Sequence, residues 1–215
     1  EIQVKKAFEA GIQSYAQSEN IESTAFQQAL TQAYALEAPF MAKVEAMDAV
    51  FDDYQHFEEL REIYFDLLMI NFFAEDVQKL EEDYLDSPDW EAIEEETIDR
   101  GTELLNIFLY LRECADDEIE PSLDDYLKEF LLVEEDEFQD EFHIYEDLIS
   151  NQALVETSVQ EICENAKILD LAEEMEELFV PTLSFFLQPA ASEQVYTDLQ
   201  KYSNNKSFDV AVYSL

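Results

Sequence analysis

The sequence predicts an all-α protein, folded as a single-domain bundle of about seven to nine helices with short connections and a strongly acidic surface. Hydrophobic residues make up 47% of the 215 residues, which is enough for one sizeable core. The chain has only 2 Gly and 5 Pro, whereas strand-rich folds need both residues at their turns. Apolar side chains also recur at the spacing of a helix face along most of the sequence.

Residues 1–50 are predicted to form the first helices, which are nearly neutral. Two sets of apolar residues recur every three or four positions and therefore lie on one helical face each. They are Val4, Phe8, Ile12 and Tyr15, followed by Phe26, Leu30, Ala33 and Tyr34.

Residues 51–150 are predicted to form central helices. Two segments, 63–74 and 104–111, are apolar on nearly every side, which is typical of helices surrounded by other helices. Ser87, Pro88 and Asp89 together indicate a helix start, with a capping hydroxyl, a proline at the first helical position and an acid in the first turn. Ser122 and Asp125 indicate a second start by the same logic.

Residues 151–215 are predicted to form the C-terminal helices, because Val159, Ile162, Cys163 and Ala166 share one face. We leave residues 207–215 unassigned, since Phe208, Val210 and Val212 alternate as in a strand over too short a stretch. No long linker interrupts the chain, so we expect one domain over residues 1–215.

The net charge of −42 is concentrated in the middle of the chain. Residues 1–50 carry 7 acids and 3 bases, residues 51–150 carry 35 and 5, and residues 151–215 carry 11 and 3, giving net charges of −4, −30 and −8. Such a surface repels nucleic acids and anionic membranes, which attract proteins through Lys and Arg. The partners it favours are cations and basic proteins, including proteins whose usual ligand is a nucleic acid.

The candidate binding residues are the acids of residues 81–99 and 113–141. On a helix, carboxylates three or four residues apart lie about 5 to 6 Å apart along one face, a spacing comparable to that of nucleic-acid phosphates. We therefore hypothesise a non-enzymatic interaction protein that presents an acidic helical face to a basic partner and mimics nucleic acid. The residues expected to carry this role are Glu81, Glu82, Asp83, Asp86, Asp89, Glu94, Glu95, Asp116, Asp117, Glu118, Asp124, Asp125, Glu134, Glu135, Asp136 and Glu137.

A plainer interpretation is that these acids form an ordinary solvated surface, as charge runs usually do. General salt adaptation would acidify the whole chain, whereas residues 1–50 use Gln, Ser and Thr where residues 51–150 use Glu and Asp. If the charges repel one another, the pKa values of many acids in the middle segment are raised on folding, and mild acid and added salt stabilise the protein.

The alternative function is a metal site. Each of the two histidines follows an aspartate by three residues, giving the pairs Asp53 with His56 and Asp140 with His143. Carboxylate and imidazole at this spacing hold iron or manganese in some four-helix bundles, where single glutamates complete the site. Glu22 or Glu37 and Glu103 are the candidates for that role, although the usual residue in such pairs is Glu rather than Asp.

Other kinds of site find no support. Asp116, Glu118 and Glu120 alternate as in a calcium loop, but Pro121 stands where that loop needs Gly. The sequence has no glycine-rich phosphate loop and no catalytic triad pattern. Cys114 and Cys163 lack metal-binding spacing, so we expect free thiols in a reducing, cytoplasmic compartment. No apolar run has the roughly 18 residues of a membrane span.

Overall fold

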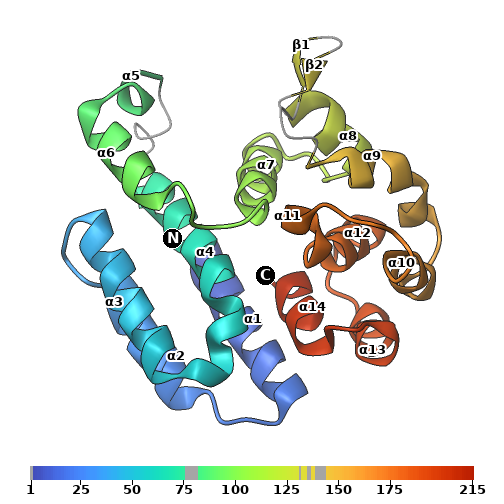
Figure 1. Ribbon diagram of the computed structural model, residues 1–215, viewed down its shortest axis with the longest axis horizontal. Coiled ribbons are helices and arrows are strands. Elements are labelled where there is room, and N and C mark those ends of the chain that lie inside the picture. The colour runs from blue at the N-terminus through green and yellow to red at the C-terminus, as the bar shows by residue number, and fades with distance from the viewer. Residues whose placement is uncertain (1, 76–81, 131, 135–136, 139–143) are drawn as a thin grey trace.

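The computed structural model describes residues 2–75, 82–130, 132–134, 137–138 and 144–215 and is built almost wholly of helices (Figure 1). This confirms the predicted fold class. The described part holds fourteen α-helical segments, more than the seven to nine expected. Much of the excess comes from the four short helices of three to six residues, which the apolar pattern of a sequence does not resolve from the links around them.

The N-terminal half of the fold is an antiparallel layer of long helices. It comprises α1 (Ile2–Glu19), α2 (Thr24–Tyr34), α3 (Phe40–Asp53), the 3₁₀ segment η1 (Gln55–Leu60) and α4 (Arg61–Glu75). Helix α4 is the predicted central helix, since all its residues from Ile63 to Asn71 are buried. Tyr64 is fully buried and donates a hydrogen bond to the Phe8 carbonyl of α1 at 2.8 Å.

The middle of the chain forms two arms that flank helix α7 (Leu104–Asp116) in the view of Figure 1. One arm is α5 (Glu82–Leu85) with α6 (Pro88–Thr97), and the other is α8 (Leu123–Asp125), the π-helical segment η3 (Tyr126–Phe130) and the strands β1 (Leu132–Glu134) and β2 (Glu137–Phe138). Both predicted caps are confirmed, because Ser87 accepts from Trp90 N and Ser122 accepts from Asp125 N.

The two strands were not predicted. They pair antiparallel, with Leu132 opposite Phe138 and Glu134 opposite Glu137. The expectation that residues 134 and 137 lie on an acidic helix is therefore wrong. Val133 and Phe138 belong to the residue types that are enriched in strands, so the local sequence is compatible with this pair.

The C-terminal part comprises α9 (Glu146–Asn151), η4 (Gln152–Glu156), α10 (Val159–Ala166), α11 (Glu173–Glu176), α12 (Phe179–Leu187), α13 (Glu193–Tyr202) and α14 (Lys206–Tyr213). Residues 207–215, which the sequence left unassigned, are helical up to Tyr213 in α14. Its Phe208, Val210, Ala211 and Val212 are all buried, because α1, α12 and α13 pack around it. The strand-like alternation thus belongs to a helix that is buried on several sides.

Helix α14 lies along α1, which joins segments far apart in the sequence (Figure 1). Gly11 of α1 permits this approach. A Cβ atom at this position would lie 2.6 Å from Leu215 Cδ2 and 2.7 Å from the Tyr64 hydroxyl. One hydrophobic cluster runs from Val4 of α1 to Val212 of α14. Among the described helices, none combines the length and the apolar character that a membrane span requires.

Candidate functional site

The first group of predicted acids lies on the α5–α6 arm. Asp83, Asp86, Asp89, Glu94 and Glu95 are all exposed. Asp89 stands in the first turn of α6, where the helix dipole favours a carboxylate, but Glu94 and Glu95 stand nearer its C-terminal end, and the last turn holds no basic residue. The described part of this arm contains no Lys or Arg. Its negative charge is therefore not compensated locally.

The second group lies at the C-terminal end of α7 and on α8. Asp116 is the last residue of α7, Asp117 caps it, and Glu118 follows with a left-handed φ of 56°. The backbone closes the helix here, since Ile119 N donates to the Cys114 carbonyl at 2.8 Å. All three acids are exposed at the negative end of the helix dipole, and none has a Lys or Arg within salt-bridge distance among the described residues.

Helix α8 carries the remaining described acids of this group. Asp124 is exposed and forms an ion pair with Lys128 at 2.7 Å. Asp125 accepts a hydrogen bond from the Tyr110 hydroxyl at 2.9 Å, so this carboxylate also holds α7 against α8. Asp125 therefore has a structural role that the sequence pattern did not indicate.

The predicted acids do not follow one long helix. They are divided between the α5–α6 arm, the C-terminal end of α7 and the arm that begins with α8 (Figure 1). For Glu82, Glu134 and Glu137 only the backbone is described, and Glu81, Glu135, Asp136, Asp140 and His143 lie outside the described residues. The structure thus places exposed acids on the α5–α6 arm, at the end of α7 and at Asp124 of α8 rather than in rows on adjacent helices.

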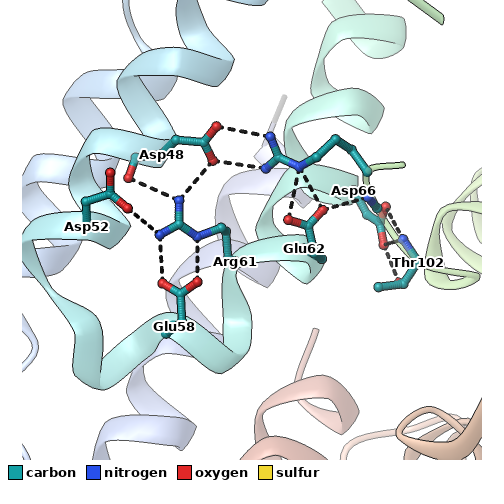
Figure 2. A network of polar contacts seen from close by, with 9 residues as sticks. Asp48, Asp52, Glu58, Arg61, Glu62, Asp66 and Thr102 are labelled. Atoms are coloured by element: carbon teal, nitrogen blue, oxygen red, sulfur yellow. Dashed lines mark hydrogen bonds and ion pairs between the residues drawn. The ribbon is translucent and has the colours of Figure 1, made fainter. Parts of the chain in front are cut away.

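Two arginines that the sequence count assigns to the acidic segment, Arg61 and Arg100, belong to a network centred on Asp48 of α3, part of which Figure 2 shows. Arg61 contacts Asp52 at 2.6 Å and Glu58 at 2.7 Å, and its Nη1 lies 3.4 Å from Asp48. Arg100, in the link between α6 and α7, donates from both terminal nitrogens to the Asp48 carboxylate at 3.0 Å.

This network fixes the link that positions both arms. The Arg100 guanidinium also bonds Glu62 of α4 through Nε at 3.0 Å and lies 4.8 Å from the centre of the Phe65 ring. Carboxylates around Arg61 and Arg100 raise the pKa of both guanidiniums, which therefore stay charged. Neither arginine remains available to offset the charge of the acidic arms.

Gly101 and Thr102, the next two residues of the link, pack against the buried carboxylate of Asp66. Asp66 of α4 is fully buried and accepts hydrogen bonds from the Thr102 backbone N–H and hydroxyl (Figure 2). Burial, the largest effect, raises the pKa of Asp66 well above its ordinary value. Gly101 adopts a left-handed φ of 85°, and a Cβ there would lie 2.5 Å from Asp66 Oδ1. The Asp66 carboxyl and the polar groups of Thr102 have hydrogen-bond partners within the protein, so we assign them a structural role.

The metal hypothesis gains no geometric support from the described residues. Asp53 is the last residue of α3 and His56 lies in η1, separated by Tyr54 in a non-helical conformation, so the expectation that they share a helical face is wrong. Glu103 accepts hydrogen bonds from the Tyr145 hydroxyl and Asn106 Nδ2. Within the described ranges, no three His, Cys, Asp or Glu side chains are grouped as metal ligands. An iron or manganese site stays a prediction that depends on Asp140 and His143.

One polar pocket was missed by the sequence analysis. It has a volume of about 300 Å³ and is lined by residues of α10, α11, α12, α14 and their links, among them Cys163, Glu177, Ser203 and Asp209. Asp209 of α14 is only 3% exposed. No signal in the sequence marked it, since residues 207–215 had no assigned structure and the segment holds a single acid.

Comparison with known proteins found no related protein. No protein-family model matches the chain, and no curated protein or solved structure is similar enough to be matched with it. The function must therefore be argued from the site itself.

Proposed function

We propose that the protein is a non-enzymatic interaction protein whose acidic surface, formed by α5–α6, the C-terminal end of α7 and α8, binds a basic partner. One observation carries this proposal. Exposed carboxylates stand at the C-terminal ends of α6 and α7, where the helix dipole disfavours them, and none of them forms an ion pair with a Lys or Arg among the described residues.

The arrangement favours a partner over simple solubility. An exposed acid contributes to solubility at any position, but at the negative end of a helix it also lowers stability by a few tenths of a kcal/mol or more. A basic partner removes this unfavourable interaction when it binds. Electrostatic attraction of this kind speeds association and selects the partner by charge.

The partner class that we propose is a nucleic-acid-binding protein, since such a protein carries the concentrated basic surface that exposed carboxylates attract. Both arms carry exposed acids, so a partner that contacts both spans α7 (Figure 1). We also propose a cytoplasmic location, because Cys114 and Cys163 are both free and buried.

The test is a pull-down from host lysate at low and high salt, followed by competition of each captured protein with duplex DNA. The variant that tests the surface combines Glu94→Gln, Glu95→Gln, Asp116→Asn and Asp117→Asn. Its matched control removes the same charge from exposed C-terminal acids by Glu156→Gln, Glu161→Gln, Asp170→Asn and Glu174→Gln.

We expect the wild-type protein and the control to capture the same basic proteins at low salt and to release them to DNA. The surface variant should capture less, because the local field and not the total charge directs binding. Equal capture by the two variants, or no enrichment of any basic protein, would overturn the proposal.

A further inference from the structure

The polar pocket near α14 lies in the C-terminal part of the fold, outside the acidic surface of α5–α8. Its volume is about 300 Å³, at the lower end of the range typical of small-molecule sites. The lining combines two kinds of group. The carboxylates of Glu176, Glu177 and Asp209 stand with the aliphatic side chains of Leu171 and Val180.

Asp209 is the most informative of these groups. Its carboxylate accepts a hydrogen bond from the Ser203 hydroxyl, and Ser203 Oγ in turn accepts from Asn205 N at 2.9 Å. Among the described residues no other donor reaches this carboxylate, so one of its oxygens has no hydrogen-bond partner. Lys167, on the neighbouring link, instead donates to the Tyr202 carbonyl at 2.9 Å. A carboxyl group buried in this way either keeps its proton or, when it is ionised, favours a cation at the oxygen that has no protein partner.

The groups around Asp209 strengthen the negative field. Burial, followed by the charges of Glu59 and Glu177, raises the pKa of Asp209 to about 7. Glu59 of η1 lies beside the same link and accepts from Asn205 Nδ2 at 2.7 Å. The Cys163 thiol of α10 stays neutral, since burial raises its pKa to about 12. The described surroundings of Asp209 therefore hold several negative charges and no cation paired with it.

We propose that this pocket binds a primary alkylammonium group, with the ammonium on the unpartnered oxygen of Asp209 and the methylene chain against Leu171 and Val180. An ammonium suits a single free acceptor, because it is a compact charge with three donors that rotate freely. A guanidinium instead favours two acceptors in one plane, and Ser203 already occupies one oxygen of Asp209. The aliphatic lining suits a chain of methylene groups, which bury along apolar surface while the charged end stays polar.

An alkylammonium group has two sources, a free polyamine or a lysine side chain of a partner protein. Two probes distinguish them: putrescine for the first source, and Nα-acetyl-lysine N-methylamide for the second. 1-Pentanol serves as the uncharged control. Binding is followed by NMR titration of the Ser203 and Asn205 amides, at a salt concentration high enough to screen the exposed acids.

We expect saturable binding of at least one ammonium probe and none of 1-pentanol. Asp209→Asn keeps the shape of the side chain and should weaken binding at least tenfold, as should Ala166→Leu, which fills the pocket. Asp117→Asn removes the same charge from an exposed position outside the pocket and should leave the affinity unchanged.

Putrescine binding alone identifies a free amine as the ligand, and binding of the lysine probe identifies a partner's lysine. Equal weakening by Asp209→Asn and Asp117→Asn, or no saturable binding of either ammonium probe, overturns the proposal. Neither result bears on the acidic surface, because the four substitutions that test that surface lie in α6 and at the end of α7.

Discussion

Asp209→Asn should make the protein less sensitive to pH. The pKa of this carboxyl rises from 3.8 to about 7 on folding, so the folded state binds the proton more tightly than the unfolded state. The resulting stability is fully present below about pH 4 and is lost as the pH rises through about 7. The difference of about 3 pH units, at 1.36 kcal/mol each, corresponds to about 4 kcal/mol. Of this, about 3 kcal/mol falls between about pH 5 and about pH 8.

The measurement is urea unfolding of the wild type and the variant at these two pH values. We expect the free energy of unfolding of the wild type to fall by about 3 kcal/mol more than that of Asp209→Asn, because an amide does not titrate. Asp66, whose pKa is also raised but by groups other than Asp209, titrates in both proteins and cancels in the comparison. Asp117→Asn, which removes the same charge from an exposed position, is the control. If Asp209→Asn loses as much stability as the wild type, Asp209 is ionised at little cost and this explanation is wrong.

Three further predictions concern the α6–α7 link and the acidic arm. Gly101→Ala should lower the free energy of unfolding, measured in urea, by about 2 to 4 kcal/mol, because the alanine would have to adopt a left-handed φ and its Cβ would clash with Asp66. An effect below about 1 kcal/mol would show that the link relaxes to avoid both. Arg100→Lys keeps the charge but loses the paired bonds to Asp48, and should cost about 1 to 2 kcal/mol, less than Arg100→Ala. Glu94→Gln with Glu95→Gln should raise the Tm at low salt but not at high salt, and a rise independent of salt would contradict charge repulsion as its cause.

The helices were predictable where the sequence carries a local signal. Ser87 and Ser122 each accept a backbone hydrogen bond within three residues, so a short pattern was sufficient to place both helix starts. The segment 63–74, apolar on nearly every side, likewise indicated the buried helix α4. Helix α14 was not predictable, because its burial depends on α1, which lies almost two hundred residues away in the chain.

The site was less predictable than the fold, because the sequence does not show which charges are neutralised. Arg100 stands directly after the acids of α6, yet its guanidinium is directed to Asp48 and Glu62. Asp66 and Asp209 each stand among apolar neighbours in their helices, and the sequence does not show which other elements cover them. Their burial follows from three-dimensional packing alone.

The pairing of α1 with α14 has a consequence for how the chain folds during synthesis. The apolar face of α1, which includes Phe8 and Ile12, is completed by α14 and by Leu215, which packs where Gly11 has no side chain. A ribosome therefore translates nearly the whole sequence before the first helix can acquire its final neighbours. Contacts of such high sequence separation slow folding, so we expect α1 to depend on chaperones or on transient contacts with α4 until then. Limited proteolysis of stalled nascent chains that lack α14 should cut within α1, and protection of α1 in those chains would contradict this view.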